Sequence, residues 1–172
     1  MSTQLLSFEV GNHRFALPAE LVREVARAVA IAALPKAPAI VEGIINFRGT
    51  LVPVLDIRQR FGLPPAPLAP EQHLIIAHAG NRLIALRVDR ALDLVVVDED
   101  VIESAALVAP GIEYVAGIAK VADGLLVIHD LETFLSFEEA GQVDDAVVGS
   151  MAAGEPGQLG PGAASPQRKG RR

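Results

Sequence analysis

The chain contains an internal repeat, which restricts the possible folds more than any other feature of the sequence. Residues 5–17, LLSFEVGNHRFAL, resemble residues 74–86, LIIAHAGNRLIAL. Further along, residues 43–57, GIINFRGTLVPVLDI, resemble residues 117–131, GIAKVADGLLVIHDL. The two matches occur in the same order and at similar offsets. Because self-similarity at a nearly fixed spacing is typical of a duplicated structural unit, the sequence predicts two copies of one fold.

Each copy has the pattern of a small β-rich unit. A Gly-Asn pair separates two apolar runs in both copies, at Gly11 and at Gly80, and Gly readily adopts the positive φ that a tight hairpin turn requires. The later runs LVPVLDI and LLVIHDL are apolar almost throughout, which is typical of strands buried between two layers. Asp56 and Asp130 close these runs and are predicted to cap short helices. Short strands with glycine turns favour a mainly β fold of two five-stranded barrels.

The domain organisation follows from the repeat and from the composition of the C-terminal segment. We predict a single domain over residues 1–148, with two subdomains at roughly residues 1–66 and 67–148 that can exchange strands. Residues 149–172 are rich in Gly, Pro and Ala and end in the basic sequence RKGRR. Such a segment buries too little apolar surface to offset its ordering entropy, so we predict a disordered basic tail.

One region is ambiguous between helix and strand. The alanine content of residues 19–33 favours a helix, whereas the repeat aligns this region with residues 88–97, which end in a valine run typical of a strand. We expect a short helical turn near Glu20–Val22 and a strand from about Arg23.

The composition excludes several classes of protein. The chain has no Cys, which excludes disulfides, thiolate metal sites and thiol nucleophiles. No apolar run approaches the about 18 residues of a membrane span, and the N-terminus lacks the basic region of a signal peptide, so we predict a cytoplasmic protein without membrane insertion. Residues 67–148 carry a net charge of −11, against +2 for residues 1–66. An acidic half without a clustered basic face argues against nucleic-acid binding.

The polar residues do not indicate an active site. Four histidines are scattered over the predicted hairpins without metal-ligand spacing: His13, His73, His78 and His129. His129 and Asp130 resemble an acid–base pair, but Asp130 aligns with Asp56 in the repeat and is better interpreted as a helix cap. The sequence contains no G-x-S-x-G nucleophile elbow and no glycine-rich phosphate loop. We therefore predict that the protein is not an enzyme and uses no cofactor or metal.

The segment NFRG, residues 46–49, places a charged residue between two apolar runs. We expect Gly49 to have a positive φ or to allow a close backbone approach. An Arg at such a turn is held rigidly and offers several donors in a fixed fork. If the strand that begins near Arg23 lies beside the turn, Glu24 is the natural partner of Arg48. Two interpretations remain open: Arg48 is an ordinary solvated turn residue, or the turn presents Arg48 to a partner.

NFRG and the following TLVPVLDIRQRFG closely resemble the CheW family, the coupling proteins of bacterial chemotaxis. LVREV and LPKAPAIVEG before this segment, and GNRLIALRVDRALDLVVV after it, match the family in order, so the resemblance covers roughly residues 4–138. Phe47 stands where the family usually has Leu, residues 26–33 are unusually rich in Ala, and the tail has no family counterpart. The resemblance implies two five-stranded SH3-like β-barrel subdomains with short helices.

The resemblance also implies an adaptor that works by binding alone. CheW-like proteins couple the cytoplasmic tips of methyl-accepting chemoreceptors to the regulatory domain of a CheA-type histidine kinase, at receptor arrays on the membrane. By position, the residues implied to bind the receptor are Val22, Glu24, Gly43, Asn46 and Arg48. The hairpin over residues 74–88 is implied to dock to the kinase, and the residues assigned to this contact are Leu74, Ile76, Leu86 and Val88.

Two alternatives remain open at the level of the sequence. The chain could be a double barrel that binds a small ligand in the cleft between its subdomains, and a large apolar pocket with convergent polar groups would favour this. It could also be a CheW-like adaptor of a pathway that controls pili, gliding or gene expression rather than flagella. The sequence does not separate these pathways.

Overall fold

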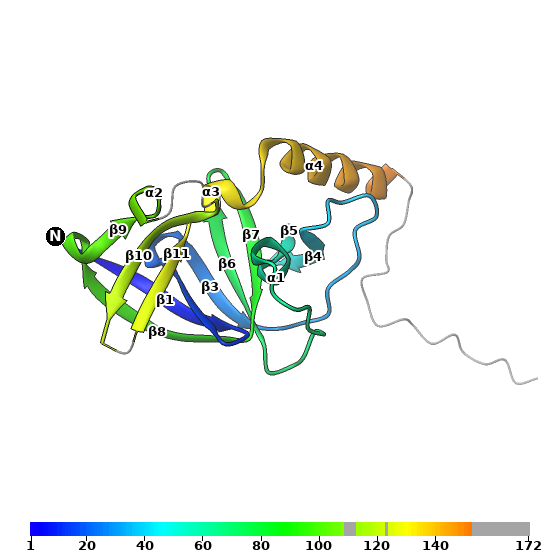
Figure 1. The fold of residues 1–172 in the computed structure, drawn as a ribbon. Helices are drawn as coiled ribbons and strands as arrows, with labels where there is room; N and C mark the ends of the chain where they lie inside the picture. The colour runs from blue at the N-terminus through cyan, green and yellow to red at the C-terminus, as the bar shows by residue number, and fades with distance from the viewer. Residues whose placement is uncertain (109–112, 123, 153–172) are drawn as a thin grey trace, which may run out of the picture.

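The computed structural model describes residues 1–108, 113–122 and 124–152, which form two β-sheets and several short helices (Figure 1). One sheet has the strand order β8-β1-β2-β11-β10-β9 and the other has the order β3-β6-β7-β5-β4. The strands of the six-stranded sheet are β1 (Ser2–Val10), β2 (His13–Pro18), β8 (Arg90–Asp98), β9 (Ile102–Ser104), β10 (Val115–Val121) and β11 (Gly124–His129). The strands of the five-stranded sheet are β3 (Val22–Arg27), β4 (Val41–Phe47), β5 (Thr50–Asp56), β6 (His73–Ala79) and β7 (Arg82–Val88).

The helices connect strands or follow the last one. They are η1 (Ala19–Leu21), α1 (Ile57–Phe61), η2 (Glu99–Val101), α2 (Ala105–Val108), α3 (Leu131–Phe134) and α4 (Phe137–Ala152). The predicted mainly β fold with short helices is confirmed, although one sheet has six strands rather than five. No helix in the described part of the chain is long and apolar enough to cross a bilayer.

The two sheets do not follow the predicted boundary at residue 66. The five-stranded sheet is built from one continuous stretch, residues 22–88. The six-stranded sheet joins the N-terminal hairpin β1–β2 to strands β8–β11, and β2 pairs in parallel with β11 through Phe15 and Ala16. Each sheet therefore takes strands from both halves of the sequence. As a consequence, the acidic second half does not correspond to one separate structural unit.

Apolar side chains form three clusters, one within each sheet and one between the sheets. The cluster between the sheets is the largest and receives side chains from both, which explains why β5 is buried on both faces. Val52 and Val54 of β5 belong to the cluster of the five-stranded sheet, whereas Leu55 belongs to the cluster between the sheets. The middle of the run LVPVLDI, residues 52–55, thus lacks the polar alternation of a half-exposed strand because both of its faces are buried.

The repeat determines equivalent turns and caps in the two halves. Gly11 and Gly80 have φ values of 64° and 62° in the β1–β2 and β6–β7 turns, which confirms both predicted hairpins. The Asp56 carboxylate accepts a hydrogen bond from the Arg58 N–H at 2.9 Å, and Asp130 caps α3 in the same way. The two predicted helix caps are therefore also confirmed.

The two C-terminal helices differ from the single helix expected after Asp130. Leu135 has extended backbone angles and separates α3 from α4. Ser136 and Glu139 then form a reciprocal capping box, in which each side chain accepts a hydrogen bond from the backbone N–H of the other residue. Arg60 of α1 donates to the Phe134 carbonyl and pairs with Glu139, which joins α1 to the start of α4.

Two other sequence expectations concern segments near the ends of the fold. Helix η1 covers Ala19–Leu21 and β3 begins at Val22, so the ambiguous region has the expected short helix followed by a strand. Helix α4 continues to Ala152, so residues 149–152 are helical rather than part of a disordered tail. The remaining residues of that predicted tail, 153–172, lie outside the described residues.

Candidate functional site

The β4–β5 turn holds Arg48 in an unusual backbone conformation. Phe47 pairs with Thr50, so Arg48 and Gly49 form a two-residue turn, and both have positive φ, of 50° and 87°. The Asn46 Oδ1 atom accepts a hydrogen bond from the Gly49 N–H at 2.8 Å and fixes the turn. A side chain at positive φ costs about 1–2 kcal/mol relative to Gly. Arg48 therefore occupies a turn position that Gly would adopt without this strain.

Glu24 meets Arg48 as the sequence suggested. The Arg48 Nη2 atom lies 2.6 Å from Glu24 Oε1, and the side chains are 66% and 33% exposed. The contact links β3, one edge of the five-stranded sheet, to the turn that follows β4, the other edge. The guanidinium also lies 5.1 Å from the centre of the Phe47 ring. An exposed ion pair adds only about 0–1 kcal/mol of stability, so its main effect is to orient a guanidinium that remains accessible.

The other predicted receptor-binding residues are placed differently. Val22 is half-buried and packs against the apolar cluster between the sheets. Gly43 is buried, and a Cβ atom there would lie 2.2 Å from the Ala32 carbonyl oxygen. Ala32 and Ile44 exchange backbone hydrogen bonds of 3.0 and 2.8 Å, so Gly43 allows the preceding loop to cover the edge of β4. Of the five residues, Glu24, Asn46 and Arg48 therefore form the turn site, whereas Gly43 supports it from within.

The residues assigned to kinase binding do not form a surface. The structure buries all four of them, with exposed fractions of 0–1%: Leu74, Ile76, Leu86 and Val88. Leu74 and Ile76 fill the core of the five-stranded sheet, and the other two pack between the sheets. Their side chains cannot contact a partner in this structure. Only the end of this hairpin, with His78, Gly80 and Asn81, is exposed.

Two exposed apolar residues near the turn site escaped the sequence analysis. Leu51 follows the turn, pairs with Asn46 and is 42% exposed. Val25 of β3 is 38% exposed and lies on the face opposite to Glu24, because successive side chains of a strand alternate. Burial alternates along VREVAR, but apolar and polar residue types do not, so residue type alone does not predict the exposure of Val25. Residue type does not predict the exposure of Leu51 either, because the run LVPVLDI is almost uniformly apolar.

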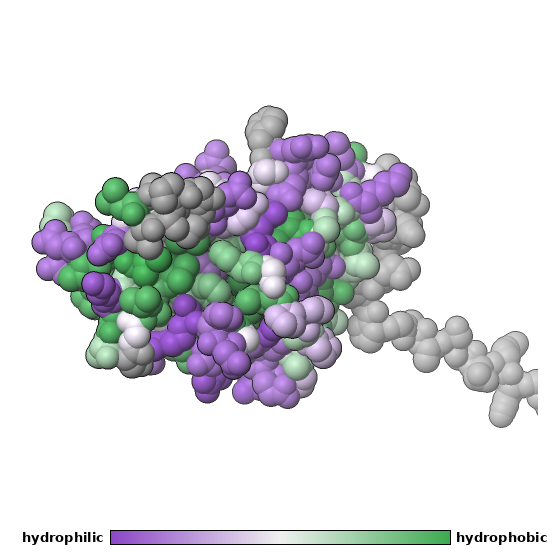
Figure 2. Space-filling view, in the orientation of Figure 1, coloured by the Kyte–Doolittle hydropathy of each residue, from purple (hydrophilic) through white to green (hydrophobic). Residues whose placement is uncertain are grey.

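A second exposed surface lies on the six-stranded sheet. Figure 2 shows apolar residues gathered over β10 and β11, while the surface near α4 is mostly hydrophilic. Leu125 of β11 is 59% exposed, and Ile118 and Val127 form a cross-strand pair of half-buried side chains. This surface and the turn site belong to different sheets, so the molecule has two separate regions that could each contact a protein.

A pocket of about 510 Å³ lies beside aromatic side chains that pack between the two sheets. It is lined by Leu63, Val115 and Val127, by three aromatic side chains and by three polar ones: Phe15, Phe61, Tyr114, His13, Arg60 and Glu113. The Arg60 guanidinium is already engaged by Glu139 and the Phe134 carbonyl, and it lies 4.5 Å from the centre of the Tyr114 ring. The pocket is apolar, but its one arginine is not free to bind a small ligand.

His129 lies behind this pocket and has no catalytic geometry. It is 1% exposed, and neither ring nitrogen has a hydrogen-bond partner in the described structure. Burial lowers the pKa of His129 to about 3, so the ring is neutral at physiological pH. Within residues 1–108, 113–122 and 124–152, no group of three or more His, Asp or Glu side chains is arranged to hold a metal ion.

The family model for the CheW-like domain matches residues 4–139. The chain belongs to the CheW-like domain family. The match covers the turn site, both sheets and the start of α4, and it ends inside that helix. The turn at Arg48 and its pairing with Glu24 thus belong to a CheW-like domain.

Known CheW proteins resemble the chain over most of its length. It is 27% identical over 139 residues to a probable chemotaxis protein CheW of Rhizobium etli, covering 80% of this chain and 90% of the relative. It is 28% identical over 138 residues to the chemotaxis protein CheW of Rhizobium meliloti, covering 79% and 89%. A crystal structure of the scaffolding protein TtCheW from Thermoanaerobacter tengcongensis superposes with a TM-score of 0.74 at 29% identity, covering 81% of this chain and 96% of that one.

Proposed function

We propose that this CheW-like protein is an adaptor that couples membrane chemoreceptors to a CheA-type histidine kinase. The family match and the relatives named as chemotaxis and scaffolding proteins support a role in chemosensory signalling. An adaptor needs two binding surfaces, and we assign these to the Arg48 turn and to the exposed end of the β6–β7 hairpin. The protein would act by binding alone, in the cytoplasm, and would reach receptor arrays through its partners.

The observation that carries the receptor assignment is the Arg48–Glu24 pair on a turn with positive φ. The guanidinium has five N–H donors, and the contact with Glu24 leaves most of them available to carbonyl or carboxylate groups of a partner. Leu51 adds exposed apolar area to the same hairpin. A receptor segment that offers both kinds of contact would be held by charge-assisted hydrogen bonds, each worth about 1.5–3 kcal/mol.

Arg48→Gly separates binding from folding. Gly favours the positive φ that Arg48 adopts with strain, so the variant should keep or gain stability and still lose receptor binding. Arg90→Gly is a control for loss of an equally exposed ion pair, because Arg90 and Glu9 lie 3.0 Å apart on the other sheet and are 60% and 33% exposed. Both variants would be tested for co-sedimentation with receptor-containing membranes and for stability in urea.

The two variants give opposite expectations for the receptor. Arg48→Gly should lower receptor affinity by about tenfold or more, while Arg90→Gly should bind like the unmodified protein. Normal receptor binding by Arg48→Gly, or an equal loss in both variants, would refute the assignment of the turn site.

On the kinase side, we place the contact at the exposed end of the β6–β7 hairpin rather than at its buried residues. His78 and Asn81 are exposed there, next to Arg82, whose side chain pairs with Asp144 of α4 at 2.6 Å. His78→Ala combined with Asn81→Ala should weaken binding to the purified kinase and leave receptor co-sedimentation unchanged. Unaltered kinase binding in this double variant would move the kinase contact elsewhere.

A further inference from the structure

The connection between α1 and β6 has a composition that restricts its backbone. Residues 63–71 read LPPAPLAPE, with prolines at positions 64, 65, 67 and 70. Proline fixes its own φ near −65°, and the residue before a proline is restricted to extended conformations. From Leu63 to Pro70, only Leu68 is neither a proline nor followed by one. The segment is therefore predisposed to the extended left-handed polyproline II helix, which has three residues per turn.

The burial of the segment has the period that this helix requires. Leu63, Ala66 and Ala69 are half-buried, and every residue between these positions is exposed, with Leu68 exposed by 42%. A period of three places one ridge of the helix against the protein and two ridges in solvent. One solvent ridge consists of Pro64 and Pro67, and the other consists of Pro65 and Leu68. The extended segment ends at Ala69, where the Gln72 N–H donates to the Ala69 carbonyl at 3.0 Å and closes a turn.

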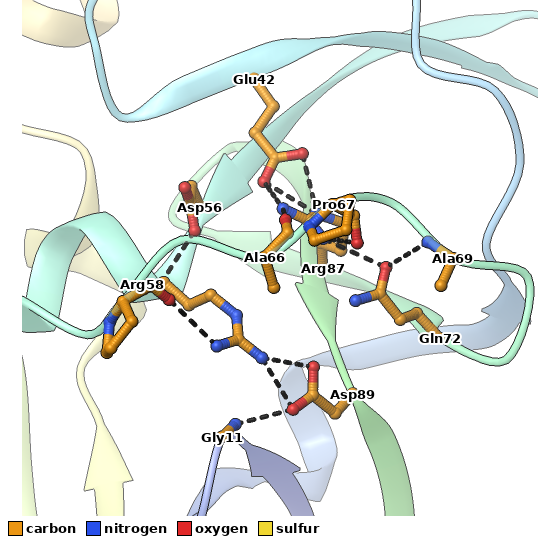
Figure 3. Close-up of polar contacts among 11 residues, drawn as sticks. Gly11, Glu42, Asp56, Arg58, Ala66, Pro67, Ala69, Gln72, Arg87 and Asp89 are labelled. Atoms are coloured by element: carbon orange, nitrogen blue, oxygen red, sulfur yellow. Dashed lines mark hydrogen bonds and ion pairs between the residues drawn. The ribbon is translucent and has the colours of Figure 1, made fainter.

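Two arginines hold the backbone of the segment (Figure 3). A polyproline II helix makes no internal hydrogen bonds, so its carbonyl groups need donors from outside. Arg58 Nη1 donates to the Pro64 carbonyl at 3.1 Å. Arg87 donates to the carbonyls of Ala66 and Pro67, at 3.0 and 3.3 Å. The inner side of the segment is thus hydrogen-bonded to the sheet, and its proline side chains are left free.

Each arginine is fixed in turn by acidic or amide groups. Buried Arg87 of β7 makes a two-pronged contact with Glu42 through Nε, at 2.8 Å to both carboxylate oxygens, and donates to Gln72 Oε1 at 3.1 Å. Arg58 pairs with both carboxylate oxygens of Asp89, at 2.6 and 2.7 Å. Such charge-assisted bidentate contacts have a defined geometry, so they preserve the shape of the segment. A connection that served only as a spacer would not need this support.

We propose that residues 63–69 form a preorganised polyproline II ligand, displayed for a partner domain whose groove is lined by aromatic side chains. Grooves of this class take proline ridges into slots between aromatic rings and exploit the low entropy of an already extended segment. The two solvent ridges supply two prolines on one side, and one proline and an exposed leucine on the other. The surface is separate from the Arg48 turn site, so this inference does not depend on the proposed receptor and kinase contacts.

The test uses the full chain and defined probes. Purified SH3, WW and EVH1 domains, which represent the known aromatic grooves for polyproline II segments, would be titrated into the immobilised protein. At least one domain should bind, and the same domain with a groove tryptophan or tyrosine replaced by alanine should not. A free peptide of residues 61–72 should bind that domain more weakly than the folded chain, because the peptide is not preorganised.

The proline ridge provides the decisive variant. Pro64→Ala combined with Pro67→Ala changes only exposed side chains and should weaken binding by about tenfold or more. Pro35→Ala is a matched control, because Pro35 is an exposed loop proline elsewhere in the chain. Circular dichroism and urea unfolding would verify that both variants fold. The proposal is overturned if no domain of the panel binds, if the double variant binds normally, or if Pro35→Ala weakens binding equally.

Discussion

Lowering the pH from about 7.5 to about 5 should destabilise the protein through His129, and replacing this residue with leucine should remove the effect. The imidazole is 1% exposed, and neither nitrogen is hydrogen-bonded in the described structure. Four phenylalanine rings surround it with centroid distances between 4.6 and 5.5 Å: Phe8, Phe15, Phe61 and Phe134. An apolar environment of this kind disfavours the charged ring, and burial lowers the pKa of His129 to about 3.

The size of the effect follows from the difference between folded and unfolded states. In the unfolded chain, a histidine takes up a proton below about pH 6.5, whereas folded His129 stays neutral until the pH approaches its lowered pKa. Above about pH 6.5 both states are neutral and the residue contributes no pH dependence. Below it, only the unfolded state gains a proton, so the free energy of unfolding decreases as the pH falls. At about pH 5 the loss from this residue amounts to about 2 kcal/mol.

Urea unfolding followed by circular dichroism at the two pH values measures this loss. His129→Leu replaces the ring with an apolar side chain of similar volume and removes two unsatisfied nitrogens, so it should be neutral or stabilising at about pH 7.5. Between the two pH values it should lose about 2 kcal/mol less than the unmodified protein. His78→Gln is the control, because His78 is exposed and its replacement should leave the pH dependence intact.

Carboxylates do not obscure this comparison. The pKa of Glu139 is raised by burial, but hydrogen bonds from Arg60 and Ser136 and the charge of Arg60 lower it overall. Stability from Glu139 is therefore present above the usual carboxylate range, near pH 4.3, and is lost only as the pH falls below it. An equal pH dependence for the unmodified protein and His129→Leu, or an NMR titration of folded His129 near pH 6.5, would refute the reasoning.

Three other predictions concern glycines and surface charge. Gly43→Ala should lower the free energy of unfolding by about 1–3 kcal/mol and Gly117→Ala by less, because their added Cβ atoms would lie 2.2 and 2.9 Å from a neighbouring backbone oxygen. Equal urea midpoints for the two variants would contradict this. Gly49→Val should cost about 1–2 kcal/mol from its φ of 87° alone, since open space surrounds the position, and a midpoint equal to that of the unmodified protein would be inconsistent with this strain. Glu99→Gln with Asp100→Asn should slow association with the kinase at low salt but not association with the receptor, measured by stopped flow. An equal change in the association rate for both partners would show that these exposed charges serve solubility.

Local features were predictable because they depend on neighbouring residues. The Gly-Asn hairpins, the Asp56 and Asp130 caps and the positive φ of Gly49 are all determined by the few residues around each turn. The Arg48–Glu24 pair was predicted only on the condition that the strand beginning near Arg23 lies beside the turn, and the structure meets this condition. In each case, conformational preferences or a single strand pairing decide the outcome.

Features that depend on distant pairing were not predictable in the same way. The parallel contact between β2 and β11 moves the N-terminal hairpin away from its neighbours in sequence, and no local pattern encodes it. Leu74 and Leu86 were assigned to a binding surface only because of their positions in the family pattern. Their burial follows from how the two sheets pack. Alternation cannot identify outward-facing residues in strands that are apolar on both faces.

The strand order has a consequence for the way the protein folds as it is made. All strands of the five-stranded sheet lie within residues 22–88, so this sheet can assemble before the rest of the chain leaves the ribosome. The hairpin β1–β2 precedes this sheet in the chain but pairs with β8 and β11, whose residues follow at 90–98 and 124–129. Pulse-labelling hydrogen exchange during refolding should then protect amides of β6 and β7 before those that join β2 to β11. This hairpin is synthesised before the five-stranded sheet but would be among the last elements to reach its native partners, which leaves its apolar strands in need of protection from aggregation during synthesis.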